Sequence, residues 1–146
     1  MPRSSFLEAK NCACFNVRKT ARVLTQEYDQ SITPSGLKTT QFSALAVIRR
    51  LGPIMITDLA KAMEIERTSL TRNLKLIERD GFIKSRSGED ARSRIVEITE
   101  AGQEKLDEAQ VLWKIVQSRI VEKFGEKRFE FLRDELAVLR SVVRSA

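Results

Sequence analysis

Apolar residues between positions 57 and 80 recur at helical spacing, and a short polar break divides them into two amphipathic segments. The break at Glu64–Glu66 predicts a tight turn between two helices. The apolar face of the first helix consists of Leu59, Ala60 and Met63, and that of the second consists of Leu70, Leu74 and Ile77.

The residues that follow predict a β-hairpin. Gly81 is expected to end the second helix, because glycine adopts the left-handed conformation without strain. Phe82–Ser87 and Arg94–Ile98 can then pair across the loop Gly88–Ser93. Helix, turn, helix and hairpin in this order are typical of a winged helix-turn-helix, whose second helix fits the DNA major groove and whose wing reaches an adjacent minor groove.

Further helices are predicted on both sides of this motif. A helix from Phe15 to about Ser31 is followed by the breaker Pro34-Ser35-Gly36. Thr39 is expected to cap a helix that ends at Leu51. The remaining predictions are a short strand at Ile54–Ile56, a helix cap at Thr57, a long helix that Thr99 starts and that spans about Glu100 to Phe124, and a last helix from about Glu126 to Arg144.

The first and last helices carry apolar seams with heptad-like spacing, although they lie at opposite ends of the chain. A small winged-helix core cannot bury these seams alone. A symmetric dimer in which the terminal helices intertwine would cover them, and an intramolecular helical bundle is the alternative. The expected fold is mainly α with a small β-hairpin wing. It is one domain over residues 1–146, with a winged-helix lobe at 37–99 and dimerisation helices at 12–35 and 100–146.

The distribution of charge favours a nucleic-acid partner. The 146 residues carry a net charge of +6, and residues 61–94 hold nine basic and six acidic side chains. Residues 100–146, by contrast, hold nine of each. Because a basic surface attracts polyanions, double-stranded DNA is the expected partner.

Composition also argues against several classes of protein. The chain has no histidine, which removes the commonest metal ligand and general base, so no cofactor, metal site or enzyme activity is expected. No apolar run reaches the roughly 18–20 residues of a membrane span. Met1–Lys10 also lacks the apolar core of a signal peptide. The protein is therefore expected in the cytoplasm, without a membrane partner.

Five short motifs follow one another along the chain: Leu59-Ala60, Arg67-Thr68-Ser69-Leu70-Thr71-Arg72, Ile77-Glu78-Arg79-Asp80-Gly81-Phe82-Ile83, Asp90-Ala91-Arg92-Ser93-Arg94 and Ile98-Thr99-Glu100-Ala101-Gly102. Together, in this order and spacing, they resemble the MarR family of bacterial transcriptional regulators. The resemblance extends from about Cys14 to Arg144. It implies a homodimer that binds a near-palindromic operator, usually as a repressor released by a small ligand or by oxidation.

The segment from Arg67 to about Arg79 is interpreted as the recognition helix. Arginine can donate two hydrogen bonds to guanine, and serine and threonine can bond to base edges or phosphates. For Arg72, a surface ion pair with Glu66 or Glu78 remains an alternative. The expected contacts on this helix are Arg67, Thr68, Ser69, Thr71, Arg72 and Lys75, of which Lys75 is the candidate phosphate contact.

The hairpin tip is the second expected contact. Arg92 matches the family position whose arginine enters the minor groove, where a narrow A·T-rich groove attracts positive charge. Arg86 and Arg94 are interpreted as phosphate contacts. Asp90 is expected to hold the loop by pairing with Arg86 or Arg92, and Gly88 is expected to allow the sharp turn.

Two kinds of switch remain open. Cys14-Phe15 is similar to a Cys-Phe pair in the organic-peroxide-sensing branch of the family, and Tyr28 matches one of that branch's tyrosines. Arg18 and Phe42 stand where its other tyrosines are expected. Cys14 and Cys12 are thus candidates for a redox switch, and two partly buried, reduced cysteines are the alternative. The second kind of switch is a small-molecule effector, which in the family is often phenolic or an aromatic acid.

Two other functions are weighed against a DNA-binding repressor. A winged-helix module can serve protein–protein contact, although its recognition face would usually be less basic. A thiol-based, peroxide-reactive protein would use Cys14 as nucleophile, but no histidine is available beside it.

Overall fold

The computed structural model describes residues 3–90 and 92–145. The ends of the predicted domain, residues 1–2 and 146, and Ala91 of the hairpin motif lie outside the described residues. The α-helices are α1 (Ala13–Ile32), α2 (Thr39–Leu51), α3 (Ile56–Met63), α4 (Arg67–Arg79), α5 (Glu100–Phe124) and α6 (Glu126–Ser145). The strands are β1 (Ile54–Met55), β2 (Ile83–Ser87) and β3 (Arg94–Ile98), and the short 3-10 helices are η1 (Arg3–Leu7), η2 (Ala9–Asn11) and η3 (Thr33–Ser35).

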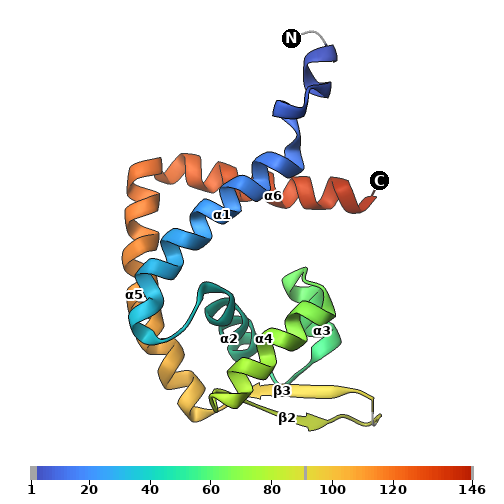
Figure 1. Cartoon of the computed structure of the whole chain (residues 1–146), viewed down its shortest axis with the longest axis vertical. Coiled ribbons are helices and arrows are strands. Elements are labelled where there is room, and N and C mark those ends of the chain that lie inside the picture. The colour runs from blue at the N-terminus through green and yellow to red at the C-terminus, as the bar shows by residue number, and fades with distance from the viewer. Residues whose placement is uncertain (1–2, 91, 146) are drawn as a thin grey trace.

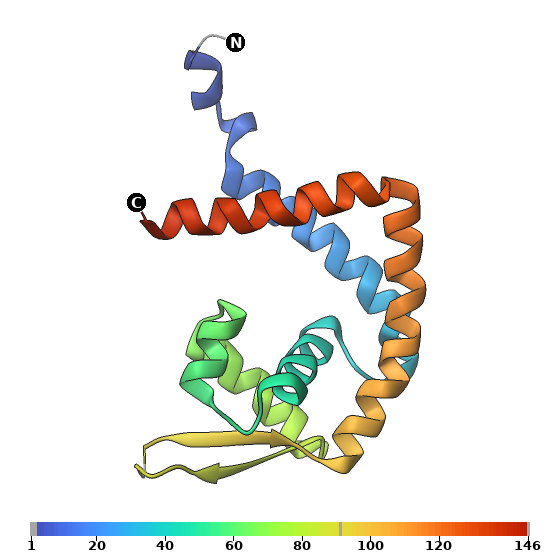
Figure 2. The same ribbon diagram turned by 180° about the vertical axis from the view of Figure 1, so that it is seen from behind.

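The elements form a lobe and a set of long helices beside it (Figures 1 and 2). The lobe contains α2, α3, α4 and the small sheet. Helix α5 leaves the sheet, runs along one side of the molecule and continues into α6, which extends away from α5 at the opposite end. Helix α1 packs against α5, and the N-terminal segment projects beyond it. The predicted fold class, mainly helical with a small hairpin wing, is confirmed.

The predicted helix-turn-helix is formed by α3 and α4. The polar break begins with Glu64, which takes the left-handed conformation with φ of 57° and ends α3. The backbone N–H of Ile65 then donates to the carbonyl of Ala60 at 3.1 Å, which closes the turn before α4. The prediction that Thr57 caps α3 is wrong. The helix begins at Ile56, and because β1 runs directly into it, the extended residue Met55 occupies the cap position without a side-chain bond.

The sheet is antiparallel with strand order β1-β3-β2. In the hairpin, Ile83 pairs with Ile98 and Ser87 with Arg94, which confirms the predicted pairing except that Phe82 precedes the strand. Gly81 has φ of 82°, so glycine is needed there for the left-handed turn out of α4. The buried residues Ile83 and Val96 face the helices of the lobe and anchor the hairpin to its core.

One hydrophobic core fills the lobe and extends to the first half of α5. Its largest fully buried side chains come from all three lobe helices, from β3 and from both neighbouring long helices. The fully buried side chains of this core are Ile32, Leu45, Ile48, Leu59, Leu70, Ile77, Val96 and Leu106. Helix α4 and the hairpin therefore pack against the same hydrophobic core.

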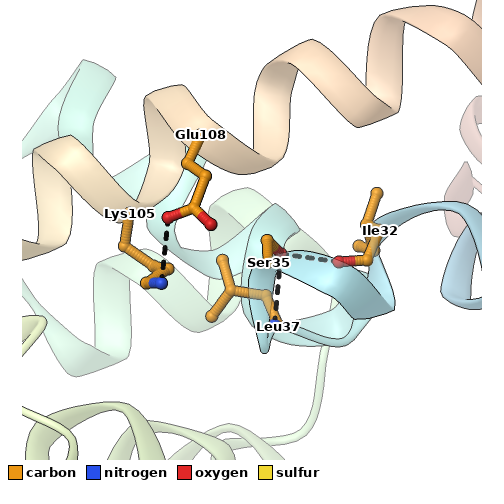
Figure 3. A network of polar contacts seen from close by, with 5 residues as sticks. All are labelled: Ile32, Ser35, Leu37, Lys105 and Glu108. Atoms are coloured by element: carbon orange, nitrogen blue, oxygen red, sulfur yellow. Dashed lines mark hydrogen bonds and ion pairs between the residues drawn. The ribbon is translucent and has the colours of Figure 1, made fainter.

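The joint between α1 and α2 is held by a buried serine (Figure 3). The Ser35 hydroxyl donates to the carbonyl of Ile32 at 2.6 Å and accepts from the backbone N–H of Leu37 at 3.3 Å. The prediction that Thr39 caps α2 is wrong, because Thr39 is the first residue of the helix. Its backbone N–H donates to Asp29 Oδ1 at 2.6 Å, so a carboxylate from α1 supplies the capping acceptor.

Helix α5 begins as predicted, with Thr99 as its cap. The Thr99 hydroxyl accepts from the backbone N–H of Gly102 at 3.0 Å and donates to the carbonyl of Gly81 at 2.6 Å. Helix α6 has no buried residue within this chain, and an ion pair between Arg144 and Glu64 connects its end to the helix-turn-helix. In residues 3–90 and 92–145, no helix combines the length and apolarity needed to cross a membrane.

Candidate nucleic-acid interface

Helix α4 turns its apolar side into the lobe and its polar side to solvent. Leu70, Leu74 and Ile77 are buried, as predicted. Among the described residues, Arg72 forms no ion pair, so its guanidinium is available to a ligand. The exposed side chains of α4 that were predicted as contacts are Arg67, Thr68, Ser69, Arg72 and Lys75.

Two polar side chains on the same helix already have partners inside the molecule. The predicted contact Thr71 is half-buried, and its hydroxyl donates to the carbonyl of Arg67 at 2.8 Å. Thr71 therefore keeps its methyl group and an oxygen lone pair for a ligand, but not its hydroxyl hydrogen. Asn73 Nδ2 donates to the carbonyl of Thr40 at 3.1 Å, so this side chain fixes α4 against α2.

The hairpin tip is ordered by Asp90 through backbone contacts. Asp90 Oδ1 accepts from the backbone N–H of Arg92 at 3.1 Å, rather than from an arginine side chain as expected. The Asp90 carbonyl accepts from the Ser93 backbone N–H and hydroxyl at 2.9 and 2.8 Å. Gly88 has no positive φ, and an added Cβ would lie 2.3 Å from the Ser93 hydroxyl, so a larger residue here would have to displace the Ser93 side chain. This arrangement leaves the Arg92 side chain exposed at the tip.

The two arginines predicted as phosphate contacts lie on opposite faces of the hairpin. Arg86 shares the outer face with Lys84 and Glu97, whose side chains form an ion pair at 2.9 Å. The hydrogen bond from Lys84 holds the pKa of Glu97 below its ordinary value, against partial burial, and the charges of Lys84 and Arg86 add to this effect. A hollow of about 250 Å³ on this face is lined by Lys84, Ser85, Arg86, Ile95 and Glu97.

On the inner face of the hairpin, Ser85 connects the wing to the recognition helix. Its hydroxyl donates to Glu78 Oε1 at 2.6 Å and accepts from Arg94 Nη2 at 2.5 Å. Sequence reasoning missed Ser85, because periodicity does not reveal which strand residue faces the last turn of α4. Glu78 was considered only as a partner for Arg72, and the structure gives it Ser85 instead.

Both cysteines lie at the N-terminal end of α1. Cys12 occupies the cap position, and its sulfur accepts from the backbone N–H of Phe15 at 3.4 Å. Cys12 and Cys14 are exposed and free in this chain, which corrects the expectation of partial burial. In the described part of the chain, no cluster of three or more histidine, cysteine, aspartate or glutamate side chains is arranged to hold a metal ion.

A hollow of about 330 Å³ lies where α1, α2 and α5 meet. It is lined by Ala21, Leu24, Thr25, Tyr28, Thr39 and Trp113. The Trp113 ring stacks on Phe42 with centroids 6.0 Å apart, and the Tyr28 hydroxyl donates to Gln117 Oε1. Burial raises the pKa of Tyr28 above its ordinary value. The buried Thr39 Oγ1 has no hydrogen-bond partner among the described residues, so a polar acceptor or donor is available at this hollow.

Large apolar side chains remain exposed along the long helices. Phe131 is 67% exposed, Val143 is 65% exposed and Ile115 is 61% exposed. The other exposed large apolar side chains on these helices include Phe15, Val17, Leu24, Val111, Leu132, Val138, Leu139 and Val142. Apolar surface of this extent on helices α1, α5 and α6 indicates an interface.

Comparisons with known proteins agree with this architecture. The model of the MarR family matches residues 35–93. The chain is 29% identical over 119 residues to YwoH of Bacillus subtilis, an uncharacterised HTH-type transcriptional regulator, covering 82% of this chain and 81% of the relative. It is 26% identical over 97 residues to the organic hydroperoxide resistance transcriptional regulator of Bacillus subtilis, which covers 66% of each.

A solved structure gives the strongest similarity among those described here. The crystal structure of the M. tuberculosis transcriptional regulator MosR in complex with DNA superposes with a TM-score of 0.83 and 39% identity. The match covers 92% of this chain and 97% of that one. The chain therefore belongs to the MarR family of winged-helix, DNA-binding transcriptional regulators, which are not enzymes.

Proposed function

We propose that the protein is a homodimeric repressor that binds a near-palindromic operator in double-stranded DNA. The observation that carries this proposal is that the exposed polar side of α4 and the exposed Arg92 belong to one lobe, whose helices and hairpin share a hydrophobic core. This arrangement supports simultaneous contact with a major groove and the adjacent minor groove. A repressor of this kind acts on the bacterial chromosome, so we place it in the cytoplasm.

The proposed base contacts come from the first two turns of α4. Arg67 and Arg72 are suited to guanine, and Thr68, Ser69 and the methyl group of Thr71 are suited to thymine or a base edge. Lys75, one turn later, is the proposed phosphate contact on this helix. On the wing, Arg92 enters the minor groove, Asp90 maintains the loop, and Arg86 binds phosphate.

The uncovered apolar surface supports the second copy of the chain. Covering a large apolar side chain stabilises an assembly by roughly 1.5–3 kcal/mol, and α6 alone carries several such side chains. In this proposal, residues 37–99 form the DNA-binding lobe, and residues 12–35 and 100–146 supply the dimer contacts. Two lobes related by a two-fold axis would read half-sites about 10 bp apart, centre to centre.

Release by a small molecule is supported by the hollow between α1, α2 and α5. Its lining combines the Trp113 ring with the unpartnered Thr39 hydroxyl, and Arg18 and Arg22 line a neighbouring hollow on α1. An aromatic ring with an anionic or phenolic group matches these side chains. A ligand there would contact α1 and α2 together, and would therefore shift the lobe relative to the long helices.

Release by oxidation is supported by a different observation. Cys12 and Cys14 are exposed at the start of α1, where an oxidant can reach both sulfurs, and Cys12 Sγ accepts from the backbone N–H of Phe15 at 3.4 Å. A change in either sulfur would act on a helix that packs against α5. One relative is named as an organic hydroperoxide resistance transcriptional regulator, which makes peroxide the first oxidant to test.

Fluorescence anisotropy on the duplex upstream of the protein's own gene tests the proposal, with titrations at several salt concentrations. Phosphate contacts release counterions, so affinity is expected to fall steeply as salt rises. Peroxide or an aromatic acid added to parallel samples is expected to release the duplex, and Cys14→Ser and Cys12→Ser separate the two sulfurs. A selection from random duplexes that yields no preferred sequence would contradict the proposal and favour a protein-interaction module. Peroxide turnover with a reductant would favour a thiol-based, peroxide-reactive protein.

A further inference from the structure

A polar relay fastens the wing to the recognition helix. Glu78 lies in the last turn of α4, Ser85 in the middle of β2 and Arg94 at the start of β3. The Ser85 hydroxyl donates to the Glu78 carboxylate at 2.6 Å and accepts from the Arg94 guanidinium at 2.5 Å. The Ser85 hydroxyl thus connects α4 to both strands of the hairpin. This connection is polar and adds to the apolar core that α4 and the hairpin share.

We propose that Glu78, Ser85 and Arg94 are positioning residues that fix the angle between the wing and α4 and so keep Arg92 in register with the base-reading side chains. This inference rests on the proposed function, because it concerns how the same interface is held. Hydrogen bonds to a carboxylate and from a guanidinium are shorter and stronger than those between neutral groups. The relay therefore resists bending of a two-stranded wing that is otherwise exposed at its tip.

The relay changes the role predicted for Arg94. One of its terminal nitrogens is committed to Ser85, and a carboxylate lies on the other side of that hydroxyl. Arg86 lies on the opposite face of the hairpin, and within the described part of the chain it forms no hydrogen bond or ion pair through its side chain. Arg86 is the phosphate contact in this proposal, and Arg94 acts through the position of the wing.

The two arginines can be distinguished by the salt dependence of binding. Removing a phosphate contact reduces the slope of log affinity against log salt by about one. Arg86→Ala is expected to reduce the slope by about this amount. Arg94→Ala is expected to lower affinity at every salt concentration while changing the slope by much less. Equal changes in slope for the two variants would contradict the role assigned to Arg94.

Ser85→Ala tests the relay most directly, on a duplex that the wild-type protein selects from a random-sequence library. Affinity is expected to fall at least about tenfold, as for the loss of a hydrogen bond to a charged group. Hydroxyl-radical protection of the minor groove under the wing should weaken, whereas dimethyl sulfate protection of guanines under α4 should remain. Ser85→Thr keeps the hydroxyl and is expected to restore both affinity and protection.

Ser87→Ala is the matched control, because Ser87 is exposed two residues further along the same strand. It is expected to bind and protect DNA as the wild type does. Glu78→Gln weakens the same relay from the side of α4 and leaves the strands of the sheet unchanged. The relay can therefore still be tested if Ser85→Ala does not fold. If Ser85→Ala and Glu78→Gln both give the wild-type footprint and affinity, the relay has no positioning role. If the wild-type protein selects no duplex at all, the proposed function fails and this inference fails with it.

Discussion

Apolar residues recur at helical spacing both in the DNA-binding lobe and in the two terminal helices, α1 and α6. The two regions differ in how these apolar faces are covered. In the lobe, Leu59, Leu70 and Ile77 are each fully buried by neighbouring elements of the same chain. In α1 only Ile32 is buried, and in α6 no residue is buried. The core of the lobe is thus covered within one chain, whereas the apolar faces of the terminal helices stay largely exposed in it.

This difference teaches that apolar periodicity predicts a buried face without saying which molecule buries it. Three helices and a sheet surround the lobe core from several directions. Helix α1 packs along α5 on one side, and α6 contacts α5 at its start and the helix-turn-helix through the ion pair between Arg144 and Glu64 (Figures 1 and 2). Substitutions in the lobe should therefore act on the stability of each chain, and substitutions in the terminal helices should act on association.

The largest effect is expected for Leu70→Ala in the lobe core. Removing a fully buried leucine side chain costs about 2–5 kcal/mol of the free energy of unfolding, because a cavity remains. Urea denaturation measures this loss. Leu76→Ala on the same helix is the matched control, since Leu76 is 44% exposed, and its cost should stay below about 1 kcal/mol. Equal losses for the two variants would contradict the assigned core.

The next effect is expected when Leu132 and Leu139 on α6 are both changed to glutamate. Two carboxylates on the proposed interface should dissociate the dimer, and operator affinity should fall about 100-fold, or about 2.7 kcal/mol, because one lobe then binds alone. Sedimentation velocity reports the mass, and circular dichroism should show that the lobe remains folded. Glu130→Gln on the same helix should leave the mass unchanged. A double variant that remains dimeric would mean that α6 is not the interface.

A smaller loss is expected for Arg92→Ala at the wing tip. Removing the minor-groove contact should weaken operator binding about 10-fold to 30-fold without changing the melting temperature, because Arg92 is exposed. Arg72→Ala should weaken binding by a similar factor and also relax the preference for one base pair. Lys123→Ala on α5 is the control for the loss of one positive charge. Unchanged binding by both arginine variants would show that this face does not contact DNA.

The smallest effect is expected for Thr99→Ala at the boundary between the lobe and α5. The variant loses the cap bond to Gly102 and the bond to the carbonyl of Gly81, which should cost about 1 kcal/mol. Thermal denaturation measures this loss. Thr20→Ala, in the middle of α1 and exposed, should change stability by less than about 0.5 kcal/mol. A cost for Thr99→Ala no larger than that of the control would show that the cap is not important.

The regular elements could be predicted because their signals are local. Gly81 and the polar break at Glu64–Glu66 set the ends of the two motif helices, and Thr99 sets the start of α5. The predictions for Thr39 and Thr57 failed because the choice of a cap depends on neighbours that are distant or already extended. Asp29 on α1 supplies the acceptor for Thr39, and β1 runs straight into α3.

The candidate interface could be predicted as a list of side chains but not as an arrangement. Helical spacing separates the exposed Arg67 and Arg72 from the buried Leu70. It does not reveal that Arg86 and Arg94 lie on opposite faces of the hairpin, since this depends on strand register. The link from Ser85 to Glu78 joins two elements across a turn, and no sequence period reports such a contact.

Binding to a set of duplexes with altered half-site spacing tests the central claim, that two lobes held by one dimer read one operator. The duplexes carry the selected half-sites with 0, 5 or 10 bp inserted between them. The account predicts tight binding of one dimer to the unaltered duplex. It also predicts a loss of at least about 30-fold with 5 bp inserted, because the second half-site then faces the opposite side of the helix. Equal affinity for all three duplexes would mean that each lobe binds independently, and would contradict the account.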